Sequence, residues 1–180
     1  MGKRVLITSY THSAVDNVML KLIEKGVARR GPPQYSKLIR IGRQEICHQD
    51  VAPILHTNLA SQQHGKQKDN VDDLPTADAL EATVSQARIV GVTALSIPRS
   101  PLLVGQAFDV VIVDEAGQIS QPAILGALMA ADTFVLVGDH KQLPPLVVSD
   151  AAEKAGKNIN DFFLSVHSLN VQFIQATAIR

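Results

Sequence analysis

The chain has 180 residues with 17 basic and 17 acidic side chains, and 46% of its residues are hydrophobic. This length and apolar content predict one globular domain with a sizeable core. No apolar run approaches the roughly 18 residues of a membrane span, and the first four residues lead into an apolar stretch without a secretory signal. The single cysteine, Cys47, excludes an internal disulfide, and its neighbour His48 has no second cysteine with which to build a typical zinc site. We therefore expect an intracellular protein that has no membrane partner.

The charges are unevenly distributed along the chain. Residues 1–43 carry nine Lys or Arg against two acidic residues, a net charge of +7, and the remainder carries −7. A basic first quarter suits contact with a nucleic-acid backbone, although a solvated helix face would have the same composition.

The first elements predicted are a strand over 5–9 and a helix that begins near Ser13, which lies three residues before Asp16 as in a capping box. Gly26 is a plausible end of this helix. One helical face would carry the apolar residues Val15, Val18, Met19, Leu22 and Ile23. The loop and first helical turn contain Thr11, His12 and Asn17, at the carboxyl end of a strand, where a helix N-terminus can receive a phosphate.

The middle of the chain has weaker signals. A short strand is predicted over 37–41, and the polar stretch 56–78 is typical of a mobile insertion. A helix is predicted over 77–86, followed by an apolar run over 88–92 that ends in Thr93.

Two unbroken apolar runs, 110–113 and 134–137, are each followed by acidic residues. Such runs are typical of strands covered on both faces of a parallel sheet. Since ligands bind outside the carboxyl ends of parallel strands, we expect Asp114 and Asp139 to lie at one edge. Carboxylates that only cap the following helix are the simpler alternative. Between the two runs, a helix with Ser120 as N-cap is predicted to be buried, because 123–131 is almost wholly apolar.

The residues after these two strands suit a magnesium–phosphate site. Asp114 would hold the metal, Glu115 would orient a water molecule, and Gln142 would sense the terminal phosphate. Asp114 and Glu115 alone are common in α/β proteins. The additional Gly138-Asp139-x-x-Gln142 pattern after one intervening helix favours the functional interpretation.

Three segments resemble the motifs of superfamily 1 helicases. Residues 114–118, Asp-Glu-Ala-Gly-Gln, resemble motif II, residues 138–145 resemble motif III, and residues 9–17 resemble motif Ia. The sequences of these segments are most similar to those of the eukaryotic DNA replication helicase/nucleases. The resemblance extends from about Val5 to about Leu146. Gly117 stands where serine is frequent in that group.

The resemblance implies an α/β fold of the P-loop NTPase (RecA-like) type, a three-layer parallel sheet incomplete at both ends. It implies part of helicase domain 1A over 1–148, with a reduced insertion at 56–78. The remaining residues, 149–180, are predicted to be a helical tail, and the segment from Val171 does not match the family's next motif.

The resemblance also implies ligands and partners. ATP and Mg²⁺ would be bound with the help of Gly138, Asp139 and Gln142, and the protein would act in the nucleus. Single-stranded nucleic acid, expected to be DNA, would contact four residues: Thr11, His12, Asn17 and Thr93.

Parts of the complete motor are absent from the sequence. The phosphate-loop pattern Gly-x-x-x-x-Gly-Lys-Ser/Thr occurs nowhere, and a second motor domain is not present. We therefore expect a helicase fragment that is inactive alone. Two alternatives remain open: an RNA helicase of the nonsense-mediated-decay type, and a non-catalytic nucleic-acid-binding fragment.

Overall fold

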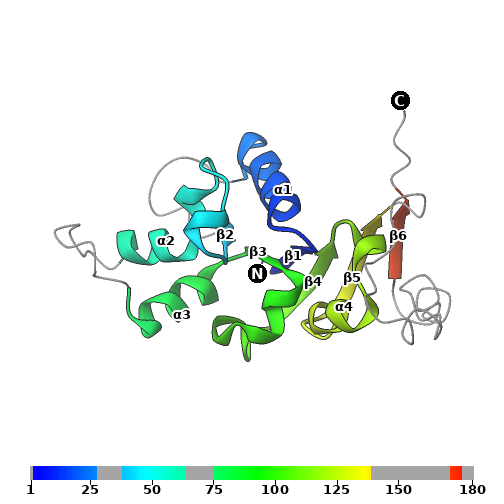
Figure 1. Cartoon of the computed structure of the whole chain (residues 1–180). Coiled ribbons are helices and arrows are strands. Elements are labelled where there is room, and N and C mark those ends of the chain that lie inside the picture. The colour runs from blue at the N-terminus through cyan, green and yellow to red at the C-terminus, as the bar shows by residue number, and fades with distance from the viewer. Residues whose placement is uncertain (1, 28–37, 64–74, 139–170, 176–180) are drawn as a thin grey trace.

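Six parallel strands form a sheet through the middle of the molecule (Figure 1). The computed structural model describes residues 2–27, 38–63, 75–138 and 171–175. The strands are β1 (Val5–Ser9), β2 (Leu38–Arg40), β3 (Ile89–Thr93), β4 (Phe108–Val113), β5 (Ala131–Gly138) and β6 (Val171–Gln175). Their spatial order is β2-β3-β1-β4-β5-β6. The predicted α/β class with a parallel sheet is confirmed.

Four α-helices cover the sheet, and they make the outer two of three layers (Figure 1). They are α1 (His12–Glu24), α2 (His56–Gln63), α3 (Ala77–Gln86) and α4 (Gln121–Leu128). None of the helices in the described part of the chain is long and apolar enough to cross a membrane.

Successive residues of β2 enter two different cores, because strand side chains alternate between the faces of a sheet. Leu38 packs with Val15 and Met19 of α1 on one face. Ile39 belongs to the larger core on the other face, which also contains Ile124 of α4. This larger core takes in buried residues of α2, α3, β3, β4 and β5: Leu59, Val84, Val90, Val92, Val111, Val113, Phe134 and Leu136.

The beginning and end of α1 are set by local hydrogen bonds. Thr11 is the N-cap, and its hydroxyl accepts the N–H of Ala14 at 3.2 Å, so the predicted capping box at Ser13 is wrong. Gly26 ends the helix as predicted, with φ +75°. The N–H groups of Gly26 and Val27 donate to the carbonyls of the last turn, in the manner of a Schellman motif.

Part of the predicted mobile insertion at 56–78 is helical. Residues 56–63 form α2, with Leu59 and Ala60 buried against neighbouring elements. Burial of these two side chains is enough to hold α2 in place. The helix packs along α3 and does not need a whole apolar face of its own. Helix α3 has the predicted bounds and is capped by Thr76, whereas residues 64–74 lie outside the described part.

The helix predicted to be buried, α4, is only half covered. Ile124 and Ala127 are buried, but Leu125 is 42% exposed, and the following Met129 is 86% exposed. Ser120 is the N-cap as predicted, although its side chain makes no capping hydrogen bond. An unbroken apolar sequence therefore does not imply contact all round the helix.

The predicted helical tail contains a strand. Residues 171–175 form β6, which pairs in parallel with β5 from Phe134 to Gly138. They are extended and not helical; the rest of 139–180 lies outside the described residues.

Candidate functional site at the carboxyl edge of the sheet

The carboxyl ends of β1, β3, β4 and β5 meet at one edge, as a parallel sheet requires. Ser9 pairs with Thr93 in the register of β1 and β3. Asp114 directly follows β4, and its N–H donates to the Thr8 carbonyl at 2.8 Å, which extends the ladder by one residue. Gly138 is the last residue of β5. The other two predicted residues of this edge, Asp139 and Gln142, lie outside the described residues.

Glu115 has an unusual backbone conformation. Its φ of +53° places it in the left-handed region, and it is the single non-glycine residue with positive φ among those described. A side chain in this region costs on the order of 1–2 kcal/mol, and such residues cluster at functional sites. Two hydrogen bonds hold the turn: the Glu115 N–H donates to Asp114 Oδ1 at 3.0 Å, and the Ser9 hydroxyl donates to Glu115 Oε2 at 3.2 Å.

Gly138 lets the end of β5 approach the turn that follows β4. A Cβ atom at this position would lie 3.1 Å from the backbone nitrogen of Gly117 and 3.3 Å from that of Ala116. Both neighbours are backbone atoms, which cannot move aside as a flexible side chain can. The end of β5 is therefore held directly beside the turn that follows β4.

The donor set at this edge fits Mg²⁺ with a phosphate ligand. Asp114 and Glu115 are half-buried carboxylates, and hard oxygen donors of this kind are what Mg²⁺ prefers. No cluster of three or more His, Cys, Asp or Glu that could hold a metal occurs within the described ranges. Mg²⁺ is commonly bound by only one or two carboxylates together with substrate phosphates and water, so the pair is sufficient on the protein side.

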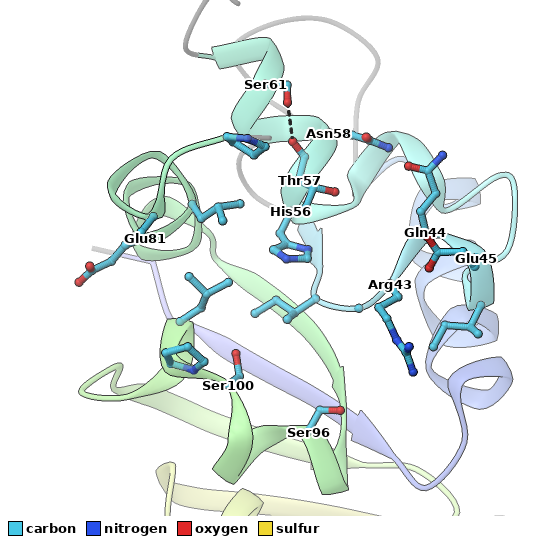
Figure 2. A pocket seen from close by; sticks show the side chains of 18 of the residues that line it. Arg43, Gln44, Glu45, His56, Thr57, Asn58, Ser61, Glu81, Ser96 and Ser100 are labelled. Atoms are coloured by element: carbon cyan, nitrogen blue, oxygen red, sulfur yellow. Dashed lines mark hydrogen bonds between the residues drawn. The ribbon is translucent and has the colours of Figure 1, made fainter. Parts of the chain in front are cut away.

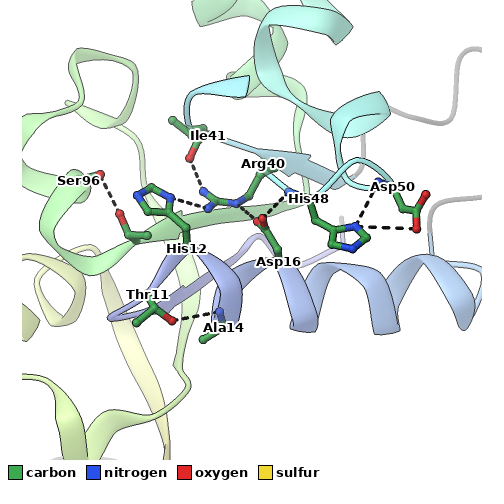
Figure 3. Close-up of polar contacts among 10 residues, drawn as sticks. Thr11, His12, Ala14, Asp16, Arg40, Ile41, His48, Asp50 and Ser96 are labelled. Carbon is green, nitrogen blue, oxygen red and sulfur yellow. Dashed lines mark hydrogen bonds and ion pairs between the residues drawn. The ribbon is translucent and has the colours of Figure 1, made fainter. Parts of the chain in front are cut away.

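The predicted nucleic-acid residues come from the loop after β1, from α1 and from the end of β3. Thr11 and Asn17 are exposed. His12 is half-buried, and its Nδ1 lies 3.1 Å from Nη2 of Arg40 (Figure 3). Thr93 is only 4% exposed, and its hydroxyl is hydrogen-bonded to that of Ser96 at 2.8 Å. Ser96 is thus more accessible to a ligand than Thr93.

A pocket of about 860 Å³ opens next to this loop, between the end of β2, helices α2 and α3, and the turn after β3 (Figure 2). His12 and Ser96 line it together with Arg43 and His56. Burial lowers the pKa of His56, and burial followed by the neighbouring Arg40 lowers the pKa of His12. Sequence reasoning missed Arg43, His56 and Ser96 because none lies in a motif; the position of Ser96 three residues after Thr93 was the only signal.

Among the described residues, the basic side chains of the first quarter do not all lie on one surface. Arg4 lies at the opposite edge, where its guanidinium donates to the carbonyls of Val84, Ala87 and Ala107 and lies 4.9 Å above the ring of Phe108. Arg40 is buried in an ion pair. These two cations serve the fold, and Arg43 is the exposed cation beside the loop after β1.

Comparison with known proteins shows the family to which the chain belongs. The AAA domain family matches residues 56–150, which include the Asp114-Glu115 turn and the close approach at Gly138. The chain belongs to this family. It is also 41% identical over 161 residues to the DNA replication ATP-dependent helicase/nuclease of Arabidopsis thaliana, 40% over 155 residues to that of Xenopus laevis and 36% over 155 residues to that of Homo sapiens.

These similarities cover 86–89% of this AAA domain chain and only 10–13% of those relatives. The resemblance to superfamily 1 helicases predicted from the three motifs is confirmed. The chain corresponds to about a tenth of the length of the curated relatives it matches.

Proposed function

We propose that this chain is part of the first motor domain of an ATP-dependent DNA helicase of the replication and repair helicase/nuclease type. The observation that carries the proposal is the Asp114-Glu115 turn. It lies at the carboxyl edge of a parallel sheet, with Glu115 held in a left-handed conformation by Ser9. The relatives are named as DNA replication ATP-dependent helicase/nucleases, which favours DNA over RNA and a motor over an inert module.

In this proposal the edge binds Mg²⁺ and ATP. Asp114 holds the metal, and Glu115, oriented by the Ser9 hydroxyl, aligns the attacking water and accepts its proton. Bound Mg²⁺ would neutralise charge on the phosphates. Gly138 holds the end of β5 beside the Asp114-Glu115 turn. Asp139 and Gln142, which follow β5 in the sequence, would contact the terminal phosphate.

The loop after β1 binds single-stranded DNA. Thr11, Asn17 and His12 present side chains or helix N-terminal groups to the backbone, and Arg43 adds a positive charge beside them. The contribution of Thr93 is to fix the Ser96 hydroxyl, because its own hydroxyl is buried in that bond. A nuclear location follows from the replication role of the relatives.

The 180 residues alone would hydrolyse ATP negligibly. They contain no phosphate-loop pattern, so the backbone nest and the lysine for the phosphates must come from helicase segments outside this sequence. In the main proposal those segments belong to the same protein as this chain. In the non-catalytic alternative they do not.

The test is binding of a labelled single-stranded oligonucleotide to the full chain at several salt concentrations. We expect weak, sequence-indifferent binding whose affinity falls linearly with the logarithm of salt concentration. Arg43→Ala should weaken binding. It should also reduce the slope of log affinity against log salt concentration by about one. Arg88→Ala is the matched control: it removes an exposed arginine at the start of β3, on the opposite edge, and should change nothing. Equal effects of both variants would contradict the proposed interface.

A further inference from the structure

A buried ion pair joins α1 to β2 immediately beneath the loop after β1 (Figure 3). Arg40 Nε donates to Asp16 Oδ1 at 2.7 Å, and the two side chains are 1% and 4% exposed. A buried charge pair is tolerated only when its remaining donors and acceptors are also satisfied. Asp16 is therefore the partner of Arg40 and not the acidic residue of the capping box predicted from the sequence.

The other atoms of this pair are indeed occupied. Asp16 Oδ2 accepts the backbone N–H of His48 at 2.8 Å, and Arg40 Nη1 donates to the Ile41 carbonyl. With the guanidinium plane fixed on two sides, the direction of its third nitrogen, Nη2, is fixed as well.

Nη2 of Arg40 lies 3.1 Å from Nδ1 of His12. A guanidinium group has five N–H donors, no acceptor, and stays protonated in proteins. Nδ1 must therefore be the acceptor, without a hydrogen of its own, and the hydrogen of the neutral ring must lie on Nε2.

The charges around His12 also favour the neutral ring. Burial lowers its pKa most, the cations Arg40 and Arg43 lower it further, and Asp16 opposes them in part. A protonated ring would place a hydrogen on Nδ1 facing the guanidinium, and both the hydrogen bond and the charge balance would be lost.

We infer that Arg40 is a positioning residue that fixes His12 as a neutral Nε2–H donor facing the pocket shared with Ser96. This rests on the proposed function, in which His12 contacts the single strand. The inference assigns one contact to His12: its uncharged ring donates a directed hydrogen bond from Nε2 to a phosphate or base oxygen. Arg40 itself touches no nucleic acid, since it is 1% exposed.

The tautomer can be measured without nucleic acid. Long-range proton–nitrogen correlation spectra of the uniformly ¹⁵N-labelled chain distinguish protonated from unprotonated ring nitrogens, and His12→Gln identifies the signals of His12 among the six histidines. At neutral pH we expect an unprotonated Nδ1 and a protonated Nε2. A ring protonated on Nδ1, or a rapidly exchanging mixture of the two tautomers, would overturn the inference.

Two substitutions then test what the tautomer does. The amide nitrogen of Gln can reach the place of Nε2, whereas that of Asn reaches only the place of Nδ1. His12→Gln should keep oligonucleotide affinity within about threefold of the original, and His12→Asn should lose about tenfold or more. Equal loss in both variants would contradict a directed Nε2–H contact.

The failures of the two proposals are separable. No oligonucleotide binding by the unaltered chain would count against the proposed function, and the spectra alone would then decide whether Arg40 sets the tautomer. Arg40→Lys, checked for folding by circular dichroism, adds a second readout, because its single ammonium group cannot make all three contacts and should release the ring into a mixture of tautomers.

Discussion

Ser9, the last residue of β1, donates its hydroxyl hydrogen to Oε2 of Glu115, which lies in the turn after the neighbouring strand β4. The two residues are 106 positions apart in the sequence, yet both lie at the ends of adjacent strands. It holds the glutamate carboxylate at the sheet edge before any ligand arrives. Positioning of this kind reduces the reorganisation needed when a reaction begins.

The left-handed conformation of Glu115 predicts an unusual order of stability among variants. Glu115→Ala and Glu115→Gly both remove the carboxylate and its bond to Ser9. Only alanine keeps a Cβ atom in the strained conformation, so the glycine variant should have the larger free energy of unfolding, by about 1 kcal/mol. Urea unfolding of the two variants measures the difference. If the alanine variant is the more stable, the strain at this position does not exist.

The ion pair of Asp16 and Arg40 predicts strong non-additivity. Asp16→Leu or Arg40→Met alone should cost about 3–5 kcal/mol, because each leaves an uncompensated buried charge. The double variant should cost clearly less than the sum, although the His48 N–H still loses its acceptor. A double-mutant cycle by urea unfolding checks this, and simple additivity would show that the pair is not coupled.

Lowered histidine pKa values predict that stability falls in mild acid. Burial lowers the pKa of both His12 and His56 in the folded chain, so below about pH 6.5 the unfolded chain takes up protons first. The free energy of unfolding should therefore be constant above that pH and decrease as the pH falls toward the folded-state values. Thermal unfolding between pH 7.5 and 5 measures it. His56→Gln should flatten the profile, because it removes one of the two groups whose pKa is lowered in the folded chain.

A fourth prediction concerns ATP hydrolysis. Steady-state phosphate release by the 180-residue chain with single-stranded DNA should not exceed the background of a Glu115→Gln variant. The carboxylates are present, but an arginine finger alone contributes about 10³–10⁵ in rate in related NTPases, and the sequence lacks the phosphate loop. Robust turnover that Glu115→Gln abolishes would show that these parts are dispensable.

Strands β1 to β5 were predictable because each contains a short apolar run with a polar end, whereas β6 lies in the predicted helical tail. Val5–Ser9 has the predicted bounds, and the turn at Gly26 follows from the conformational freedom of glycine. The acidic residues after β4 could be placed at the carboxyl edge for the same reason. Rules about apolar runs and the polar residues that end them describe the local sequence. The positions of these strands and of the turn depend mainly on that local sequence.

Other features depended on contacts between distant segments. The capping box predicted at Ser13 was wrong, because the chain becomes helical one residue earlier and Thr11 is the N-cap. The position of Arg40 beside His12 could not be read from the sequence, because 28 residues separate them and no sequence pattern relates the two positions. Likewise, the exposure of Met129 depends on what packs around α4, which its apolar sequence does not specify.

The central place of β1 in the sheet also has a consequence for how the chain folds. Val5 pairs with Ile89 on one side and Val110 on the other, so this strand waits for partners made 84 and 105 residues later. Such long-range parallel pairings form slowly, because loop closure costs entropy before the contacts are gained. During synthesis the sequence Val-Leu-Ile-Thr-Ser therefore remains an unpaired apolar strand. Its exposure makes the ribosome-bound chain a natural client for a chaperone until β4 has emerged.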